Sequence, residues 1–552
     1  MDEYEIRKEK IRKLKELKIN SYPYSFLRTH TSREIKENYE KFIENKQEIR
    51  VAGRIYLERD FGKTKFYTIA DGYDKIQVYF RKDMLNEKYE LLDLFDIGDF
   101  IGVSGEVFKT KTGEITILVK DFVLLSKSLR PFGEKYHGLR DRELRYRQRY
   151  LDLLNNQEVR EVFLKRSKII SLIREFLDKK GFIEVETPIL QPIYGGAFAT
   201  PFKTFYESLD KEFYLRISDE LYLKRLLIGN LERVYEIGKD FRNEGISRFH
   251  SPEFTQIEIY QAYADYYTMM ELFEELFLFL VKNLYNDDKF IYGEKFYYDE
   301  ENRREIFLRI KELKEKGINI NKINIYYSKE KDNEEKEYLS FCEELINFCK
   351  GNNLSYREEK SSERYTEIEF LIETKPPFKR IKFTESLNEI LGIDILQIPF
   401  KFLKEKAKEL GIDFKEEITK TKLLDKLFSS LIQKYLIQPT FVIDHPRITT
   451  PLAKPHRENP LLCERFEVFI GGIELGNAFS EENDPQRQKE SFLELLRLKE
   501  DETPLDEDFI CALEYGMPPS GGLGIGIDRL VMILTNQSAI REVILFPQLK
   551  EK

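Results

Sequence analysis

The sequence has 552 residues with a formal net charge of −9, and 41% of its residues are hydrophobic and 34% charged. This length exceeds one ordinary hydrophobic core, so we expect two or three domains with a well-solvated surface. No apolar stretch follows a basic start, and the nearest approach to a membrane-spanning run, residues 276–281, is far too short. These features argue against export and membrane insertion and predict a cytoplasmic protein.

The charge is distributed unevenly along the chain. Residues 1–150 carry a net charge of about +6, so the remainder carries about −15. A basic N-terminal part joined to an acidic body suits a polyanion on one module and a cationic ligand on the other. For the Lys-rich helix expected over residues 8–18, a plain solvated face explains the charge equally well.

Residues 1–48 predict a polar helical segment, and residues 49–130 change to short β-like runs. The five runs cover residues 50–56, 65–70, 76–80, 100–107 and 114–119, with turns such as Asp71-Gly72 between them. Five short strands with a helical insert after the third fit an OB-type barrel, a fold that often binds single-stranded nucleic acid. The pattern alone leaves a generic small barrel open.

An Arg-rich connector over residues 131–152 predicts a linker to a larger domain. That domain, residues 153–299 and 378–552, opens with a helix over residues 158–180 that Gly181 closes, and a short strand follows at residues 182–187. A hairpin over residues 241–260 comes next: Phe254, Gln256, Glu258 and Tyr260 share one face, and Thr255, Ile257 and Ile259 the other. This alternation predicts a half-buried strand that presents polar groups to a cavity.

Residues 300–377 break the composition with Lys, Glu, Asn and Tyr. They predict a small α/β insertion of helix, strand (318–327), helix (334–349) and strand (366–372), with no motif that indicates a chemistry. Four cysteines, of which Cys342 and Cys349 lie on the second of these helices, form no CxxC pair, and the five His residues are scattered. We therefore expect no zinc site and a reduced protein with both helix cysteines buried.

The run Gly521-Gly522-Leu523-Gly524-Ile525-Gly526-Ile527-Asp528-Arg529 predicts a Gly-lined strand that leads into an apolar helix. It does not match a Rossmann loop, because the sixth position from Gly522 is Ile527 and no βαβ unit follows. Glycines here would let a flat ring lie against the backbone, with Arg529 in the first helical turn able to reach a phosphate.

Together these segments resemble the three motifs of class II aminoacyl-tRNA synthetases, in the right order, and more narrowly the bacterial-type lysyl-tRNA synthetases. The resemblance covers everything but the insertion. It rests on the motif-like segments 180–188, 241–260 and 522–529 and on the segments 138–141, 147–153, 194–197, 222–226 and 474–481. It implies an α+β fold in which an OB barrel reads the anticodon and an antiparallel-sheet domain carries the active site, and it implies a homodimer.

The resemblance also implies a two-step reaction and a set of nucleotide-binding residues. L-lysine attacks the α-phosphate of ATP, and the lysyl group then passes to the terminal adenosine of tRNA(Lys). Arg242 would hold the α-phosphate and Arg529 the γ-phosphate; adenosine would contact Glu244, His250 and Phe254. Glu467 and Glu474 would bind Mg²⁺, whose hard character suits oxygen ligands. No nucleophilic side-chain arrangement stands out, which agrees with electrostatic catalysis by cations and metal.

For the amino acid, the resemblance implies contacts from backbone and side chains in four separate segments: Gly196, Glu220, Glu258, Tyr260, Asn477, Phe479 and Glu481. An excess of carboxylates matches a substrate that carries two ammonium groups. In the barrel, Phe66 and Gln77 match the positions used for base stacking and base-edge reading, and Glu114 is a weaker third candidate. The competing interpretation of Phe66 is an aromatic residue in the barrel core.

The segments depart from the family at a few positions. Phe249 stands where Arg usually precedes the motif His, with Arg248 one place earlier, and Thr200, Ser251 and Ala478 are also atypical. The nearest rival family is that of the aspartyl- and asparaginyl-tRNA synthetases, but Glu220 stands where that branch has a Gln, and a carboxylate there would repel aspartate. An enzyme that lysylates a protein would lack the barrel, and a non-catalytic paralogue would lack Arg242 or Arg529.

Overall fold

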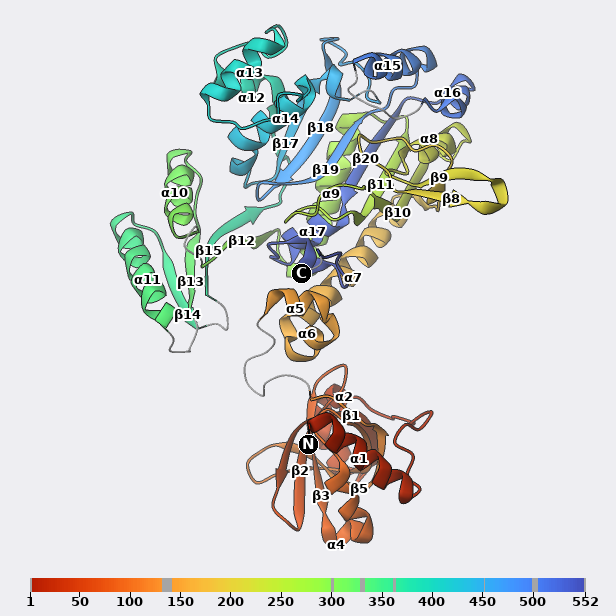
Figure 1. Ribbon diagram of the computed structural model, residues 1–552, viewed down its shortest axis with the longest axis vertical. Helices are drawn as coiled ribbons and strands as arrows, with labels where there is room; N and C mark the ends of the chain where they lie inside the picture. Colours follow the sequence, from red (N-terminus) through yellow and green to blue (C-terminus); the bar gives the residue numbers. More distant parts are fainter. Residues whose placement is uncertain are drawn as a thin grey trace. The chain divides into compact units, whose positions relative to one another are not determined.

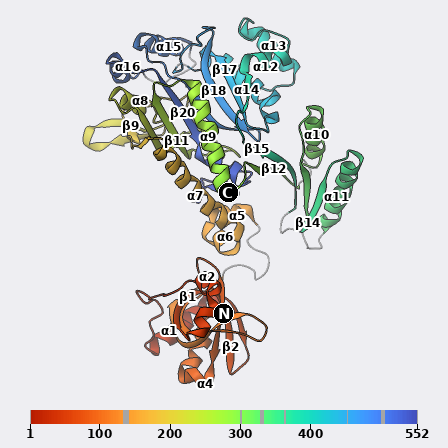
Figure 2. The same cartoon turned by 180° about the vertical axis from the view of Figure 1, so that it is seen from behind.

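The computed structural model describes residues 2–131, 141–298, 302–327, 333–360, 364–450, 452–498 and 505–550. It separates into two compact units, residues 1–135 and 136–552. Among the helices in these ranges, none is both long enough and apolar enough to cross a membrane. Each unit is described by itself (Figures 1 and 2).

The N-terminal unit is a closed five-stranded barrel. Its strands follow the order β1-β2-β3-β5-β4, with bounds β1 (Glu48–Asp60), β2 (Thr64–Ala70), β3 (Lys75–Arg81), β4 (Phe100–Lys109) and β5 (Ile115–Ser126). The helical insert after the third strand is α4 (Lys82–Leu85) with the 3-10 helix η1 (Asn86–Leu94). The predicted OB architecture is confirmed. Strand β5 runs beyond its predicted end because Phe122 and Leu124 stay buried, and β1 does so because its residues up to Asp60 still pair with β2.

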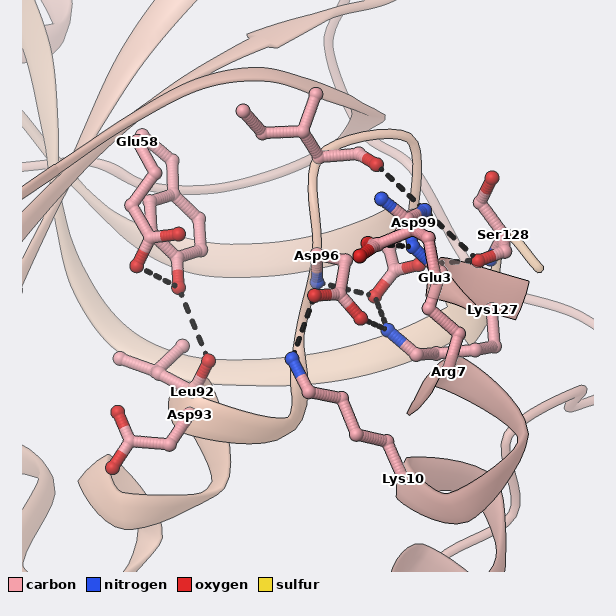
Figure 3. Close-up of polar contacts among 12 residues, drawn as sticks. Glu3, Arg7, Lys10, Glu58, Leu92, Asp93, Asp96, Asp99, Lys127 and Ser128 are labelled. Carbon is pink, nitrogen blue, oxygen red and sulfur yellow. Dashed lines mark hydrogen bonds and ion pairs between the residues drawn. The ribbon is translucent and has the colours of Figure 1, made fainter. Parts of the chain in front are cut away.

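Three helices precede the barrel and share its core: α1 (Glu3–Glu16), α2 (Ser32–Glu37) and α3 (Tyr39–Glu44). Each contributes one buried apolar side chain, Leu14, Ile35 and Phe42 respectively. A polar cluster also fastens α1 at the exit of β5 (Figure 3). Fully buried Lys127 forms ion pairs with Asp96 and Asp99, and Asp96 also pairs with Lys10 of α1 at 2.6 Å.

The second unit is built on an eight-stranded sheet. Its order is β16-β17-β18-β19-β20-β11-β10-β6, and all neighbours are antiparallel except the two edge pairs β16–β17 and β10–β6. The bounds are β6 (Ile183–Glu184), β10 (Arg233–Phe241), β11 (Glu253–Ala262), β16 (Lys379–Lys382), β17 (Thr440–Pro446), β18 (Leu462–Ile470), β19 (Ile473–Ser480) and β20 (Ser520–Gly526). This is the predicted antiparallel-sheet domain.

Apolar helices cover one face of this sheet: α7 (Gln157–Lys179), α9 (Tyr266–Tyr285) and α17 (Ile527–Leu534), with the short α18 (Ile540–Val543) beside them. The helix predicted over residues 158–180 is α7, found within one residue of its expected bounds. Gly181, just past α7, has a φ of +78°, a conformation that favours glycine. Further helices of this unit are α8 (Glu220–Ile228), α12 (Phe383–Leu391), α13 (Phe400–Glu409), α14 (Lys420–Leu431), α15 (Pro485–Leu498) and α16 (Glu507–Glu514).

A small three-stranded sheet, β7-β9-β8, completes the second unit with β7 (Leu190–Gln191), β8 (Lys203–Tyr206) and β9 (Lys211–Leu215). Three short 3-10 helices complete the elements of the described chain: η2 (Glu207–Leu209), η3 (Gln433–Tyr435) and η4 (Arg447–Thr449).

Part of the predicted 131–152 linker is helical. Residues 132–140 lie outside the described ranges, but α5 (Arg142–Arg147) and α6 (Arg149–Asn155) follow. Buried Arg149 pairs with Asp152 at 2.6 Å and donates to the carbonyl oxygens of residues 541, 544 and 545. The arginines that suggested a solvated connector thus include one that anchors α6 on the C-terminal segment.

The predicted insertion forms a four-stranded sheet with order β12-β15-β13-β14 and two helices. Its elements are β12 (Lys289–Tyr297), α10 (Asn302–Glu315), β13 (Lys322–Tyr327), α11 (Asn333–Gly351), β14 (Tyr356–Lys360) and β15 (Tyr365–Glu373). Both Cys342 and Cys349 are buried in α11, as predicted. Strand β12 lies before the predicted start at residue 300, and its buried Phe290 and Tyr292 belong to the same apolar core as α9 and α17. The insertion therefore shares the core of the second unit.

Candidate active site

A cavity of about 520 Å³ lies over the centre of the eight-stranded sheet, on the face opposite α9. Its walls come from β11, β18, β19, β20, α8 and the loop between β10 and β11. They contain thirteen of the fourteen residues predicted to bind ATP, metal or lysine: Gly196, Glu220, Arg242, Glu244, His250, Phe254, Glu258, Tyr260, Glu467, Glu474, Asn477, Phe479 and Arg529. Glu481, the fourteenth, is buried behind this wall.

Two central strands determine which side chains reach the cavity. On β11, Ile257 and Ile259 are fully buried on the helix side, while Glu258 and Tyr260 line the cavity, so the predicted alternation is confirmed. On β20, glycine leaves room for side chains from the neighbouring strands. A Cβ atom at Gly524 would lie 2.5 Å from Oε1 of Glu258, and one at Gly522 would lie 2.0 Å from Oε1 of Glu481.

One end of the cavity carries two arginines. Arg242 follows directly after β10, with its guanidinium 5.1 Å from the ring centre of Phe254, and Arg529 sits in the first turn of α17. Arg529 donates to a carboxylate oxygen of Glu474 at 3.2 Å and to Nε2 of His250 at 3.1 Å. Since arginine only donates, Nε2 accepts, and burial together with Arg529 lowers the pKa of His250. A neutral imidazole beside two fixed cations suits a polyanionic ligand.

Acidic residues face these arginines. Glu467 of β18 pairs with Arg465 at 2.5 Å, and burial, reinforced by the nearby Glu474 on β19, raises the pKa of Glu467 to about 8. Asp425 of α14 also lines this wall, and burial raises its pKa. Sequence reasoning missed Asp425 and Arg465. Within the described ranges, no group of three or more His, Cys, Asp or Glu side chains has the geometry to hold a metal ion.

The other end of the cavity collects carboxylates. Glu258 accepts hydrogen bonds from the Tyr260 hydroxyl at 3.1 Å and from the Gln256 amide at 3.2 Å. Burial raises the pKa of Glu258 well above its ordinary value, and the nearby carboxylate of Glu220 adds to the effect. Burial likewise raises the pKa of Glu481 to about 8. Several buried carboxyls without enough cations make this end a site for positively charged groups.

One buried cation lies among these carboxylates, and sequence reasoning missed it. Lys224 of α8 is fully buried and forms ion pairs with both Glu220 and Glu481. Gly196 faces the same region with a φ of +83°, and a Cβ atom there would lie 3.0 Å from Ser218. Asn477 also lines the cavity and accepts a hydrogen bond from Arg465 at 2.9 Å.

The atypical loop residues also have defined positions. Arg248 donates through Nε to the carbonyl oxygen of Ser538 at 2.5 Å, and Ile540 donates its N–H to the carbonyl oxygen of Arg248. Phe249 lines the cavity. The loop is therefore fixed to the segment between α17 and α18. Ala478 is fully buried in the core, where it pairs with Phe466 and Leu523 on the adjacent strands.

In the barrel, the three predicted anticodon contacts lie on neighbouring strands. Phe66 of β2 stacks on Tyr79 of β3 with ring centres 4.3 Å apart, and it is absent from the apolar barrel core. The side chain of Gln77 on β3 accepts a hydrogen bond from Thr116 at 2.9 Å, and Glu114 is exposed just before β5. Phe66 therefore lies outside the apolar barrel core.

Comparison with known proteins agrees with both units. Residues 141–550 match the tRNA synthetases class II (D, K and N), and residues 49–125 match the OB-fold nucleic acid binding domain. The chain is 44% identical over 554 residues to the lysine–tRNA ligase of Carboxydothermus hydrogenoformans, covering 99% of this chain and 98% of the relative. It is 46% identical over 554 residues to that of Thermoanaerobacter pseudethanolicus and 44% over 560 residues to that of Thermotoga maritima, covering 99% of this chain and 96% of each relative.

The match to the family extends along nearly the whole chain, and the predicted motif residues meet in one cavity. The sequence resemblance is confirmed, and the chain belongs to the class II tRNA synthetases, within the group of lysine–tRNA ligases.

Proposed function

We propose that this protein activates L-lysine with ATP and transfers the lysyl group to the terminal adenosine of tRNA(Lys). The observation that carries the proposal is one cavity with two ends of opposite character. Arg242 and Arg529 define an end for phosphates, and Glu220 and Glu258 define an end for ammonium groups. Membership of an ATP-dependent ligase family supports the reaction type.

In the first step, a carboxylate oxygen of lysine attacks the α-phosphorus of ATP. The bond to the bridging oxygen breaks and pyrophosphate leaves, so negative charge develops around the phosphorus without any protein nucleophile. We assign Arg242 to the α-phosphate and Arg529 to the γ-phosphate, where fixed cations stabilise that charge. Phe254 would stack on adenine, with Glu244 and His250 at the nucleotide. In the second step, a ribose hydroxyl of tRNA attacks the lysyl carbonyl and AMP leaves.

Mg²⁺ fits the acidic wall beside Arg529. Glu467 and Glu474 would supply carboxylate oxygens from adjacent strands. Burial, reinforced by the nearby Glu474, raises the pKa of Glu467, and a bound cation would favour its ionised form. Two protein carboxylates are sufficient, because Mg²⁺ usually keeps several waters and completes its shell with substrate phosphates. When bound, the ion would supply electrostatic stabilisation of the phosphates.

Selectivity for lysine would come from the carboxylate end. Three carboxylates would compensate the two ammonium groups: Glu220, Glu481 and Glu258, the last held by hydrogen bonds from Tyr260 and Gln256. Asn477, Phe479 and the backbone of Gly196 would complete the pocket. A substrate with a carboxylate side chain would be repelled here, which argues against aspartate. In the barrel, Phe66 would stack on an anticodon base, and Gln77 and Glu114 would contact base edges.

A second copy of the chain is the proposed partner of an apolar surface on the second unit. Exposed apolar side chains concentrate on or beside the short strands β6 to β8: Ile183, Ile189, Leu190, Phe198, Phe205, Tyr206 and Leu209. Apolar patches of this kind mark interaction sites.

The four unpaired cysteines support a reducing compartment such as the cytoplasm.

Exchange of labelled pyrophosphate into ATP tests the adenylation step. We expect exchange with lysine and none with aspartate or asparagine, and purified tRNA(Lys) should then accept lysine. Exchange that does not depend on lysine, or no exchange at all, would refute the assignment. Sedimentation of the purified protein tests the dimer, which a monomer at micromolar concentration would contradict.

A further inference from the structure

Lys224 is a fully buried lysine behind the wall of the pocket proposed for a lysine substrate. It lies one helical turn after Glu220 on α8, so both side chains share one face of that helix. Its Nζ atom forms ion pairs with Glu220 at 2.5 Å and with Glu481, which follows β19. Its ammonium also lies 5.5 Å from the ring centre of Phe479. An ammonium without water persists in a protein only when such partners compensate its charge.

Each of the two ion pairs uses one oxygen of its carboxylate. Lys224 engages Oε1 of Glu220 and Oε2 of Glu481. In the described part of the chain, Oε1 of Glu481 has no hydrogen-bond partner, and it occupies the space that Gly522 leaves by having no Cβ. Lys224 thus fixes both carboxylates from behind while at least one oxygen stays available to a ligand.

The charges of these four side chains match the two ammonium groups of lysine only when Lys224 is counted. Glu220, Glu258 and Glu481 contribute three negative charges when ionised, and Lys224 contributes one positive charge. The resulting charge of −2 is equal and opposite to that of the two ammonium groups of lysine. Without Lys224 the ligand would leave one buried carboxylate uncompensated, which is costly in a site closed to water.

We propose that Lys224 is a positioning residue for the amino-acid substrate: it orients Glu220 and Glu481 and sets the charge of this carboxylate cluster to the value that the two ammonium groups of lysine neutralise. This inference rests on the proposed function, because it assumes that lysine occupies the cavity. It assigns no contact between Lys224 and the substrate.

The test is lysine-dependent pyrophosphate exchange by the full-length Lys224→Met variant. Methionine has a similar length but no charge. We expect KM for lysine to rise at least tenfold, while KM for ATP and kcat stay within threefold of the wild-type values. The matched control is Lys127→Met, which removes an equally buried lysine with two carboxylate partners from the barrel unit. This control should leave all three constants unchanged.

Two further measurements separate positioning from general damage. Lys224→Arg keeps the charge and should hold KM for lysine closer to the wild-type value than Lys224→Met does. In a double-mutant cycle, Lys224→Met combined with Glu481→Gln should lose no more affinity than the worse single variant, because one residue acts through the other. Additive losses, or an equal rise in KM for ATP, would overturn the inference. If Lys224→Met does not fold, Lys224→Arg and Glu481→Gln still test the inference. A KM for lysine in Lys224→Arg as high as that in Glu481→Gln would overturn the inference.

The wild-type protein distinguishes failure of this inference from failure of the proposed function. If wild-type protein exchanges with lysine and Lys224→Met has an unchanged KM for lysine, only the inference about Lys224 is wrong. If the wild-type protein shows no lysine-dependent exchange, the proposed function itself is wrong.

Discussion

Replacing Glu258 by glutamine removes one charge from the acidic end of the cavity and keeps the shape of the side chain. The glutamine side chain can still meet the Tyr260 hydroxyl and the Gln256 amide, which lie 3.1 and 3.2 Å from the carboxylate oxygens. What it loses is a hydrogen bond that a substrate ammonium group donates to a charged carboxylate. A hydrogen bond to a charged group contributes about 1.5–3 kcal/mol. At about 1.4 kcal/mol per factor of ten, kcat/KM for lysine should fall about 10- to 150-fold.

Glu253→Gln is the matched control for this variant. It makes the same chemical change on the same strand, but Glu253 forms only a partly exposed ion pair with Lys239 at 3.3 Å. Such surface pairs contribute about 0–1 kcal/mol, so Glu253→Gln should change lysine kinetics by less than about fivefold. Initial rates of pyrophosphate exchange, with lysine and ATP varied separately, measure both variants.

Thermal unfolding separates a substrate contact from a folding defect. Because burial raises the pKa of Glu258, the folded protein without substrate does not gain from an ionised carboxylate at this position. The neutral variant should therefore unfold at the same temperature as the wild type or higher. Equal kinetic losses in Glu258→Gln and Glu253→Gln, or a lower unfolding temperature that parallels the loss of activity, would refute the assignment of Glu258 to the substrate.

Four other outcomes follow from the described contacts. Arg529→Ala should abolish adenylate formation, measured by pyrophosphate exchange, while tRNA binding, measured by filter retention, persists. Loss of both would contradict the assignment of adenylation and anticodon binding to separate sites. Phe66→Ala should lower kcat/KM for tRNA about 5- to 150-fold, since base stacking contributes about 1–3 kcal/mol, and should leave exchange unchanged. The pKa of Glu481 is raised to about 8 from an ordinary value near 4.5. Between these two pH values, the folded protein without lysine therefore binds more protons at Glu481 than the unfolded chain does. Its unfolding temperature should therefore fall as pH rises toward 8, and saturating lysine should reduce that fall; a flat profile in both states would contradict this. Asn536→Ala removes hydrogen bonds to the Gly293 N–H and Glu367 and should lower stability by about 2 kcal/mol, seen in urea unfolding, without changing KM for lysine.

The sequence predicts the active-site strand well because its information is local. Residues 254–260 alternate between apolar and polar side chains, and a strand with one buried face requires that alternation. The glycines of β20 could be located in the same way, but their effect could not. Gly522 and Gly524 make room for Glu481, Tyr260 and Glu258, which come from β11 and from the residue after β19, and only the strand order brings these side chains together.

Residues whose role depends on distant partners could not be predicted. Lys224 lies in the sequence Tyr222-Leu223-Lys224-Arg225. The sequence does not show which of the two adjacent cations on this helix is buried. In the fold, Arg225 reaches Asp506 and Asp508 near the surface, whereas Lys224 points inward to Glu220 and Glu481. The hydrophobic period of α8 does not separate them, because long cationic side chains can extend from either side of a helix.

The insertion shows how a chain can add a sheet without interrupting the one that holds the active site. Its first and last strands, β12 and β15, are antiparallel neighbours, and the first residue of β12 pairs with the last of β15, Lys289 with Glu373. Just outside this pair, Thr374 donates its N–H to the carbonyl oxygen of Asp288 at 3.0 Å. The chain therefore returns to the point it left, between α9 and β16. A boundary at residue 300 would separate β12 from its partner and expose Phe290 and Tyr292, so the structural junction lies at residues 288–374, where the backbone closes on itself.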